Sequence, residues 1–570
     1  MKIVVGAIAG MGLLFASGGQ GAFAEQHDIT GVLYLLLLDK KSSTGPHASL
    51  TYSDYPTACL ACHNNGSAGN QYDQLWNSIH YQWLGTAEDM LNQSDTQQGK
   101  LTNSVNSYCI NILGNWPVCG SCHAGRGIKP GNGDTKANID CLVCHNKDYA
   151  TQRTRLPDGS MGVTMPTDSM VQNIHAPTRT NCLMCHATAG GGDGVKRGDL
   201  SVATINNADA TFDVHMNTVG SDLSCQSCHV FNDHKVIGKG SDLRPTDDQE
   251  RGSEVSCTTC HATMATSGHA STTTDRHVSR GKIACQVCHI SIYAKVATET
   301  HRDWLYHHDG TDATTCSDAS PCPGHPHTEK AADLTPKYKW WNRLSDNYLL
   351  GDDASITYDA ALETYPTSRP FGTFDLDDTD TKIYPFKYKT AKQPMITDNN
   401  VLAALDTFVY MVGTGNVTEA VETGLVNMGY PASQTVEWVT TDTYQLLNHG
   451  VEPAATALDC TDCHSGASGL TTNTRMPFAA LGYHDFRNSS VNLCALCHEL
   501  ENDNRIDIHD RHVRSIGYAC ADCHGTGAPL RKPQGDLCND CHGFESDTIQ
   551  NIHIKHVKDK KYDCNECHFF

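Results

Sequence analysis

Hydrophobic residues form short segments along this chain, and the longest apolar run lies at its N-terminus. Lys2 is followed by the apolar run Ile3–Phe15 and then by the small-residue pattern Ala22-Phe23-Ala24. A basic residue, an apolar core and an A-x-A site are the three parts of a secretory signal peptide. We therefore expect residues 1–24 to be a signal peptide and the mature chain to begin at Glu25, in the periplasm.

The next apolar run, Val32–Leu38, is too short to cross a bilayer, since a membrane-spanning helix takes about 20 apolar residues. No other segment comes close, so the sequence predicts no membrane span. No cysteine lies near the expected cleavage site, which argues against a lipid anchor. We expect a soluble exported protein that is periplasmic, associated with the outer membrane, or extracellular.

Aromatic residues and a histidine recur at helical spacing just after residue 70. Trp76, His80 and Trp83 stand at positions i, i+4 and i+7, which share one face of an α-helix. The spacing predicts a helix over Tyr72–Trp83. Its apolar face could cover a large planar ligand, with His80 directed toward that ligand.

A second local pattern predicts a helix over Thr441–Asn448. The segment runs into His449 and stops at Gly450, a residue type that commonly ends helices. The long stretch before it, from about residue 291, contains short amphipathic segments with tryptophan and tyrosine. These segments indicate folded structure in that part of the chain.

The chain as a whole has little apolar material for a core. Of its 570 residues, 39% are hydrophobic and 7% are aromatic, whereas ordinary globular domains have roughly 45–50% apolar residues. The net charge of −22 argues against nucleic acid or an anionic membrane as a partner, because both attract basic surfaces. We expect a partner with basic surface, and a non-protein group that fills part of the interior.

One motif, Cys-x-x-Cys-His, occurs twelve times and uses 24 of the 27 cysteines. Random placement at this composition would give about 0.07 copies, so the repetition is not accidental. The cysteine pairs are Cys59 and Cys62, Cys119 and Cys122, Cys141 and Cys144, Cys182 and Cys185, Cys225 and Cys228, Cys257 and Cys260, Cys285 and Cys288, Cys460 and Cys463, Cys494 and Cys497, Cys520 and Cys523, Cys538 and Cys541, and Cys564 and Cys567. The adjacent histidines are His63, His123, His145, His186, His229, His261, His289, His464, His498, His524, His542 and His568.

This motif has the spacing of covalent haem attachment. Two thiols three positions apart form thioethers with the two vinyl groups of one haem, and the adjacent histidine becomes the proximal iron ligand. A single copy would also suit a structural zinc site or a redox dithiol, but twelve copies in an exported chain predict a dodecahaem c-type cytochrome with 12 covalently bound haem c. At roughly 45 residues per haem, the expected fold class is a multihaem cytochrome c of short helices and loops wrapped around closely packed haems, with little sheet.

The remaining histidines can supply a second ligand to each iron. Twelve of the 31 histidines lie in motifs and 19 lie elsewhere, and a low-potential electron-transfer haem most often takes a second histidine. The candidate distal ligands are His47, His80, His175, His215, His234, His269, His277, His449, His484, His509, His512, His553 and His556. His27 is interpreted as a surface residue, and His301, His307, His308, His325 and His327 are left undecided.

The spacing of the motifs divides the mature chain into three regions. Residues 25–290 carry seven motifs, and residues 291–480 form a haem-poor region with the eighth motif. Residues 481–570 carry the last four motifs and form a C-terminal tetrahaem module. So dense a module can barely fold without its haems, because little protein is left to bury.

Residues between the motifs resemble a known family, the octahaem tetrathionate reductases. The resemblance covers about residues 44–470, which would hold eight haems, and the last four motifs lie outside it. It rests on non-haem residues in the same order: Asn106-Ser107-Tyr108-Cys109, Cys119-Gly-Ser-Cys122-His123-Ala-Gly-Arg-Gly-Ile-Lys129, Asp140-Cys-Leu-Val-Cys-His145, Pro177-Thr-Arg-Thr-Asn-Cys182, Gly190-Gly-Gly, Asp213-Val-His215-Met216 and Ile383-Tyr-Pro-Phe-Lys387.

The resemblance implies a distinct site at the second motif. In this family a lysine shortly after the motif ligates the second haem, and Lys129 occupies that position, with His123 as the proximal ligand. An amine is a displaceable ligand, so substrate could bind at that iron. The family also places an unpaired cysteine there, which Cys109 matches, whereas the family's aromatic-Lys-acidic run reads Ile128-Lys129-Pro130 here.

Two further cysteines, Cys316 and Cys322, are not followed by a histidine. In an exported chain their spacing predicts a disulfide that closes a small loop. An atypical haem site is the alternative. These two residues and Cys109 are the only cysteines of the chain outside the twelve motifs.

Two functional classes remain open. In the first, the protein carries electrons outside the cytoplasm in an anaerobic or extracellular, metal-reducing respiratory chain. Its partners would be other cytochromes or an outer-membrane porin–cytochrome complex, by analogy with exported dodecahaem cytochromes. In the second, it reduces a small sulfur or nitrogen oxyanion (tetrathionate, nitrite or hydroxylamine) at the Lys129 haem, assisted by Cys109.

The state of the irons separates these two classes. A carrier needs every iron closed by two ligands, whereas a reductase needs one iron that is open or weakly capped. A polymerising filament is a third interpretation, which no feature of the sequence distinguishes.

Overall fold

The computed structural model describes residues 45–91, 97–105, 112–238, 255–262, 282–373, 380–463, 475–478 and 480–481. Seven complete motifs and the cysteines of the eighth fall within these ranges. The predicted signal peptide and the C-terminal tetrahaem module lie outside them. So do the predicted site residues Cys109, His269, His277, His464, His484, Cys494, Cys497, His498, His509, His512, Cys520, Cys523, His524, Cys538, Cys541, His542, His553, His556, Cys564, Cys567 and His568.

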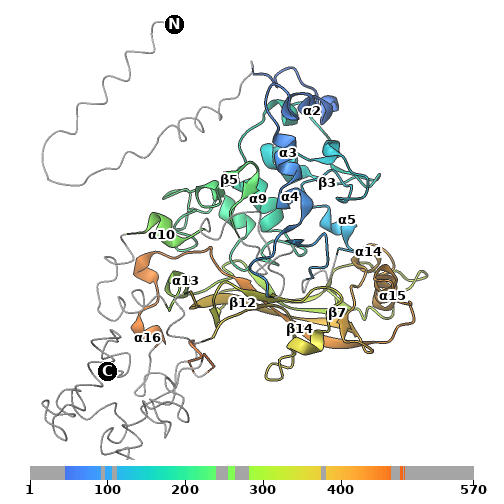
Figure 1. Ribbon diagram of the computed structural model, residues 1–570, viewed down its shortest axis with the longest axis vertical. Coiled ribbons are helices and arrows are strands. Elements are labelled where there is room, and N and C mark those ends of the chain that lie inside the picture. The colour runs from blue at the N-terminus through green and yellow to red at the C-terminus, as the bar shows by residue number, and fades with distance from the viewer. Residues whose placement is uncertain are drawn as a thin grey trace, which may run out of the picture.

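The motif-rich part of the chain, up to residue 289, consists of short helices joined by turns (Figure 1). The Cys-x-x-Cys-His spacing suits a single helical turn, because residues three and four apart share one face. Four of the motifs end in such a helix, and the second motif begins where one ends. The helices are α2 (Thr57–His63), α3 (Gln71–Trp76), α4 (Ile79–Gln82), α5 (Trp116–Cys119), α6 (Leu142–His145), α7 (Lys147–Gln152), α8 (Ser169–Gln172), α9 (Arg179–His186), α10 (Cys257–Cys260) and α13 (Cys285–His289).

The helix predicted over Tyr72–Trp83 is interrupted. Helix α3 ends at Trp76, and α4 begins after Ser78, whose backbone is extended at φ −91° and ψ 159°. Helix α4 then ends at Trp83, which has a left-handed φ of 53°. Trp76, His80 and Trp83 therefore do not share one helical face. The prediction of a single helix was wrong because the Ser78 hydroxyl donates to the Leu75 carbonyl at 2.9 Å, a local bond by which serine competes with the helix backbone.

The second part of the described chain is an eight-stranded mixed sheet, so the expectation of little sheet was wrong for this region. The strand order is β10-β11-β14-β12-β7-β8, and β9 and β13 also pair with β12. The strands are β7 (Thr298–His307), β8 (Pro326–Ala331), β9 (Lys337–Trp341), β10 (Ser345–Asn347), β11 (Tyr365–Pro370), β12 (Lys382–Ile396), β13 (Val401–Leu402) and β14 (Val436–Leu446).

Strand β14 replaces the helix predicted over Thr441–Asn448. It pairs antiparallel with β12 from Val436 opposite Ile396 to Leu446 opposite Phe386. Its residues are rich in valine, threonine and tyrosine, which favour strands because they pack well on a pleated surface. Gly450 has a left-handed backbone with φ 76°, as expected for a glycine that ends an element. The element before it is strand β14 and not a helix.

One end of the sheet carries the largest apolar core among the described residues. Helices α14 (Thr407–Met411) and α15 (Val417–Asn427) cover this end, as Figure 1 shows. Trp304, Leu405, Tyr410 and Leu425 are fully buried here. Asn416 caps α15 by accepting a hydrogen bond from the Glu419 amide, as expected for an N-cap asparagine.

The other end of the sheet holds the seventh and eighth motifs. Helices α13 and α16 (Cys460–Cys463) lie at this end (Figure 1). Val287 and Cys463 join a cluster with Tyr338 and Trp340 of β9. No helix in the described part of the chain is long and apolar enough to cross a membrane.

Candidate metal centres

Five predicted distal histidines each lie opposite a motif histidine from a different part of the sequence. Their ring centres are 6.0–6.5 Å apart. The pairs are His47 with His63 at 6.3 Å, His80 with His186 at 6.2 Å, His234 with His145 at 6.5 Å, His215 with His261 at 6.0 Å, and His449 with His229 at 6.0 Å.

This separation fits two imidazoles that share one metal ion. A metal-bound imidazole nitrogen lies about 2 Å from the ion and about 1.1 Å from its own ring centre, so two rings on opposite sides of one ion have centres about 6 Å apart. The paired histidines are therefore spaced for six-coordinate iron.

In the pair formed by His145 and His234, both rings keep Nε2 available for a metal. His145 donates from Nδ1 to the backbone carbonyl of His175, at 3.0 Å. His234 Nδ1 lies 2.9 Å from the Gln74 side-chain oxygen. A hydrogen bond at one ring nitrogen fixes the tautomer and orients the other nitrogen toward the metal.

The pair formed by His229 and His449 has the same arrangement. His229 donates from Nδ1 to the Ile237 carbonyl at 2.8 Å, and His449 Nδ1 lies 2.9 Å from a carboxylate oxygen of Asp199. Burial alone would raise the pKa of Asp199, but the Arg197 charge and the hydrogen bond from His449 hold that pKa well below its usual value. The result is an ionised carboxylate that orients a predicted ligand.

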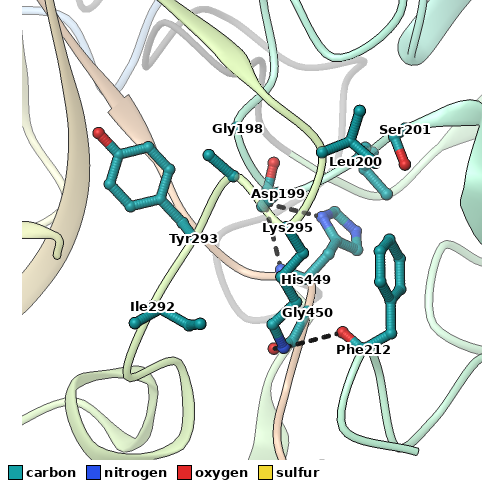
Figure 2. Close-up of a pocket in the computed structure, with 12 residues that line it drawn as sticks. Gly198, Asp199, Leu200, Ser201, Phe212, Ile292, Tyr293, Lys295, His449 and Gly450 are labelled. Atoms are coloured by element: carbon teal, nitrogen blue, oxygen red, sulfur yellow. Dashed lines mark hydrogen bonds and ion pairs between the residues drawn. The ribbon is translucent and has the colours of Figure 1, made fainter. Parts of the chain in front are cut away.

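Figure 2 shows Asp199 and His449 beside a shallow surface pocket, which Phe212, Tyr293 and Lys295 also line. The Lys295 ammonium is held by the backbone carbonyls of Thr211, Phe212 and Gly450. Because these bonds engage its donors, the pocket offers no spare cation to an anionic ligand. One side of the His449 side chain lines this pocket and can be reached by solvent.

Burial also keeps paired rings in the form that binds metal. It lowers the pKa of His186 to about 3, and it lowers the pKa of His80 below its usual value. Only a neutral imidazole has a lone pair for a metal ion. These two rings therefore offer that lone pair at neutral pH.

Cysteines of different motifs lie near one another and connect the first motif, through the third to the sixth, with the seventh, while the second motif joins at the fourth. The side chains of Cys122 and Cys185, of Cys182 and Cys225, and of Cys257 and Cys285 lie close enough to shift one another's pKa. Electrostatic interactions further link Cys59 with Cys141, Cys144 with Cys185, and Cys228 with Cys260. Groups attached to these cysteines would therefore be neighbours from the first motif to the seventh.

The series continues toward the eighth motif. Cys463 of the eighth motif packs in the apolar cluster of Tyr338, which also contains Val287 of the seventh motif. Burial is the main reason that the pKa of Tyr338 rises to about 12.

The second motif is built differently from the five paired ones. His123 is fully buried, and its ring centre lies 5.0–5.2 Å from those of Tyr81, Trp83 and Trp116. Its Nε2 donates to the Tyr81 carbonyl at 2.5 Å, and its buried Nδ1 has no hydrogen-bond partner among the described residues. Burial lowers the pKa of His123 to about 4. Here an aromatic enclosure takes the place of a facing histidine.

Lys129 is half-buried on a loop that packs against this enclosure. Asn138 binds the Ile128 backbone on one side and the Tyr81 hydroxyl on the other. The Lys129 side chain makes no hydrogen bond or ion pair with any residue that the structure describes. The structure brings the Lys129 loop near the enclosure but shows no contact with His123, so the ligand role of Lys129 stays a prediction.

His175 is the described candidate that does not face a motif histidine. Its Nε2 accepts from the Lys147 amide at 3.0 Å, and its Nδ1 lies 2.7 Å from the Ala176 carbonyl. Both ring nitrogens are engaged. Its backbone carbonyl instead orients His145, a role that sequence reasoning missed because any residue type can supply a carbonyl.

The surface around the fifth and sixth motifs is suited to a large apolar group. Val219 is 79% exposed, Val230 51% and Val255 45%, and the motif cysteines Cys228 and Cys257 are exposed as well. Exposed apolar side chains close in sequence to exposed motif cysteines are a surface that a covalently attached porphyrin would cover. Together with the paired histidines, the residues present fit haem.

Comparisons with known proteins agree with this chemistry. A family model described as "Cytochrome c bacterial" matches residues 324–467. The crystal structure of octaheme cytochrome c from Shewanella oneidensis superimposes with a TM-score of 0.62 at 28% sequence identity, covering 77% of this chain and 97% of that one. An uncharacterized protein of Archaeoglobus fulgidus is 26% identical over 227 residues, which span 31% of this chain and 73% of the relative.

These matches confirm the resemblance to octahaem cytochromes that the sequence predicted, and with it covalently bound haem c. They also confirm the multihaem cytochrome fold, with the sheet as the correction. The match covers nearly all of the octahaem protein but leaves 23% of this chain outside it.

Proposed function

We propose that this multihaem c-type cytochrome, similar in fold to the octahaem cytochromes c, carries electrons through a row of closed haem irons. Bound haem supplies a reversible one-electron change between ferric and ferrous iron. At the five paired motifs the chain would supply two histidine ligands to the iron and the hydrogen bonds that orient them.

The five histidine pairs carry this proposal. An iron with two imidazole ligands has no vacant position for a substrate, so its chemistry is limited to gaining and losing an electron. The hydrogen bonds at Nδ1 of His145, His234, His229 and His449 hold the rings in one orientation. Partners of this kind raise the basicity of a ligating histidine and stabilise its bond to the metal.

The series of motif cysteines gives the direction in which the sites are connected. It runs from the first and second motifs through the third and fourth to the seventh, and the eighth lies beyond Tyr338. We propose that the four remaining motifs continue this row, which makes 12 haems. The haems of these four motifs would then form the end of the row that meets a partner, either another cytochrome or an outer-membrane porin–cytochrome complex.

The wider setting follows from the sequence. A signal peptide would export the chain to the periplasm, where a respiratory chain with an external or anaerobic acceptor would use such a row. The charge of −22 favours a partner with basic surface.

A second function is favoured by one observation, the enclosure around His123. This motif histidine faces three aromatic rings instead of a histidine. An iron there, capped weakly by Lys129, could bind a small sulfur or nitrogen oxyanion. In that case the other haems would deliver electrons to a reductase site.

A rapid-mixing experiment separates the two functions. The reduced holoprotein is mixed with tetrathionate, nitrite or hydroxylamine, and separately with soluble iron or an oxidised cytochrome, while haem reoxidation is followed by absorbance. The carrier proposal predicts fast reoxidation only by iron or the cytochrome. Fast reoxidation by one of the small compounds would instead establish the reductase.

A matched pair of variants locates such a reaction. Lys129→Ala removes the predicted weak ligand, and Lys337→Ala removes an exposed lysine at the start of β9. A reductase at the second motif predicts a changed rate with Lys129→Ala alone. Equal rates for both variants and the wild type would exclude Lys129 from the reaction.

A further inference from the structure

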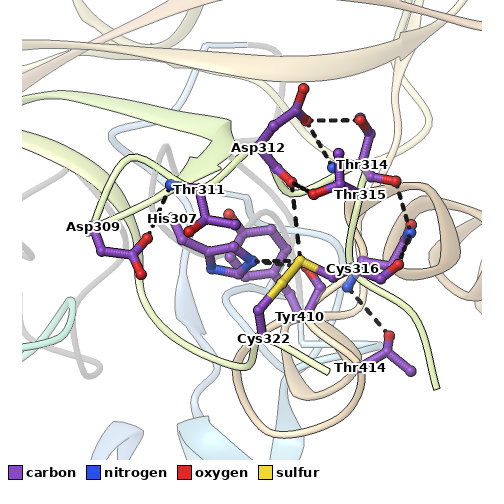
Figure 3. The surroundings of a disulfide bond; sticks show 12 residues. His307, Asp309, Thr311, Asp312, Thr314, Thr315, Cys316, Cys322, Tyr410 and Thr414 are labelled. Atoms are coloured by element: carbon purple, nitrogen blue, oxygen red, sulfur yellow. Dashed lines mark hydrogen bonds between the residues drawn. A yellow bond between two sulfur atoms is a disulfide. The ribbon is translucent and has the colours of Figure 1, made fainter. Parts of the chain in front are cut away.

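A cluster of two cysteines and a histidine lies between strands β7 and β8, away from the haem motifs (Figure 3). As the sequence predicted, Cys316 and Cys322 form a disulfide, with a Cα–Cα distance of 5.6 Å. His307, at the end of β7, directs Nε2 to within 3.6 Å of the Cys316 sulfur. One ligand atom from each of the three residues lies within 4.8 Å of the other two.

This donor set matches a metal site. Two thiolates and one imidazole are ligands that zinc and similar thiophilic ions prefer. Zinc bonds of about 2.3 Å to sulfur and about 2.0 Å to nitrogen place the two ligand atoms roughly 3.5 Å apart in a tetrahedral site. His307 and Cys316 already have that separation, at 3.6 Å.

The cluster is also shielded from water. His307 is 2% exposed and Cys316 is 3% exposed. The His307 ring packs against Tyr410, with ring centres 4.6 Å apart. A buried polar ring is costly to leave unsatisfied, and the buried Nδ1 of His307 has no hydrogen-bond partner in the described part of the chain.

Contacts other than the disulfide hold both cysteines near His307. The Cys316 carbonyl accepts from the Asn416 side chain at 2.6 Å, and the Cys322 amide donates to the Thr414 carbonyl at 2.9 Å. Both partners lie on the loop between α14 and α15, which also supplies the Gly415 carbonyl that His307 Nε2 binds at 2.9 Å. When the sulfur–sulfur bond is broken, the two thiols therefore stay beside the imidazole.

We propose that Cys316, Cys322 and His307 bind one thiophilic divalent cation such as Zn²⁺ when the disulfide is reduced, and release it when the disulfide forms. Reduction adds two electrons and two protons to the disulfide and gives two thiols. A dithiol of the exported compartment supplies both and itself becomes a disulfide. Binding of the cation then releases the two thiol protons. The ring proton of His307 moves from Nε2, which donates to the Gly415 carbonyl in the oxidised form, to Nδ1, so that the Nε2 lone pair binds the metal.

Haem attachment brings the chain into contact with a reductant that could also open this disulfide. The sulfurs of the Cys-x-x-Cys-His motifs must be thiols to add to haem vinyl groups, so they have to be reduced before attachment. Cys316 and Cys322 of the same chain meet the same reductant. A cation held by these two thiols and His307 would keep them out of disulfides with motif cysteines at that stage.

Zinc binding to the holoprotein tests this proposal directly. The protein is reduced with a water-soluble phosphine, which leaves thioethers intact, and desalted without oxygen. It is then dialysed against Zn²⁺, and bound zinc is measured by mass spectrometry of the elements. We expect one more zinc per chain in the reduced than in the untreated wild type. Equal zinc in both would overturn the proposal, and this comparison needs no variant to fold.

Variants assign the extra zinc to the cluster. His307→Ala should weaken binding more than tenfold, since loss of even a supporting residue costs a zinc site 10–100-fold. His308→Ala, which changes the exposed neighbouring histidine, should leave it unchanged. The double variant Cys316→Ser and Cys322→Ser should bind no extra zinc after reduction. It still contains Cys109, so this thiol is present in both proteins. Retention of the extra zinc in that double variant would place the metal elsewhere and refute the assignment.

Discussion

The motif-rich region and the sheet region are stabilised in different ways. The sheet region has a continuous apolar core, in which Trp304, Leu405 and Leu425 are fully buried. The motif-rich region has short helices and smaller apolar clusters, such as that of Tyr72, Tyr81 and Ile139. We therefore expect haem to fill the interior of the motif-rich region and to lie beside the sheet region without entering its core.

The sheet region nevertheless builds part of the redox chain. Strand β14 ends at Leu446, close before His449, and Asp199 holds that histidine opposite His229. Helix α13 of the seventh motif contacts β12. The sheet region has its own apolar core and can therefore hold His449 in a fixed position. From there His449 is a predicted ligand for a haem of the motif-rich region.

The largest expected effect comes from preventing haem attachment. Without haem, the motif-rich region loses the group that fills its interior, and we expect residues 45–289 to lose protection from amide hydrogen exchange. The sheet region, residues 298–446, should keep its protection because its core contains only side chains. Loss of protection in both regions at once would show that the sheet also depends on haem.

The next effect concerns a buried ion pair in the sheet. Glu299 is fully buried and contacts Arg302 at 2.6 Å and the Lys389 ammonium. We expect Glu299→Gln to cost the sheet region about 3–5 kcal/mol, because it leaves buried positive charges unpaired. Chemical unfolding followed by far-ultraviolet circular dichroism measures the change, and Glu437→Gln, on the same sheet, is the control.

The same carboxylate makes the sheet sensitive to acid. Burial alone would raise the pKa of Glu299, but the charges of Lys389 and Arg302 lower it below 4.5. A depressed folded-state pKa adds stability above the unfolded value, and this stability is lost as pH falls below about 4.5 toward the folded pKa. Glu299→Gln should reduce the slope of stability against pH in that window, and an unchanged slope would contradict the assignment.

A smaller loss of stability is expected when a side chain of the apolar core in the sheet region is shortened. Leu425 of α15 is fully buried, whereas its neighbour Val426 is 56% exposed. Leu425→Ala should destabilise the sheet region by about 2–5 kcal/mol through a cavity, and Val426→Ala by less than about 0.5 kcal/mol. Haem absorbance should not change in either variant at temperatures below unfolding. A change in haem absorbance with Leu425→Ala would show that the two regions unfold together.

The smallest effect concerns a partner of a ligand. Asp199→Asn should weaken the His449–iron bond about 10–100-fold, because the amide orients and polarises the ring less well than the carboxylate. The change can be followed by displacement of the histidine with added imidazole or cyanide, using Asp209→Asn as the exposed control. Equal displacement in both variants would show that Asp199 does not support the ligand.

The sequence predicted the residues whose chemistry is local and missed those defined by distant neighbours. Twelve motifs and a short-loop disulfide can be read from spacing alone. The sheet could not, since β12 pairs with β14 about 50 residues later and with β7 about 90 residues earlier. Asp199 was missed for the same reason, because it meets His449 from 250 residues away.

Which histidine faces which motif was also beyond the sequence. The list of candidates included His80 and His234, but only the fold brings them to His186 and His145. His80 faces that motif although the long helix expected around it is broken at Ser78. The position of His80 depends on the break at Ser78 and not on the spacing of Trp76, His80 and Trp83 along a single helix.

The central claim is that facing histidines close the haem irons, and electron paramagnetic resonance of the frozen oxidised holoprotein tests it most directly. His449→Ala removes one facing histidine, and His301→Ala removes a histidine that bonds Thr390 on the sheet. We predict that His449→Ala converts one low-spin haem to high spin while His301→Ala leaves the spectrum unchanged. An unchanged spectrum for His449→Ala would contradict the account.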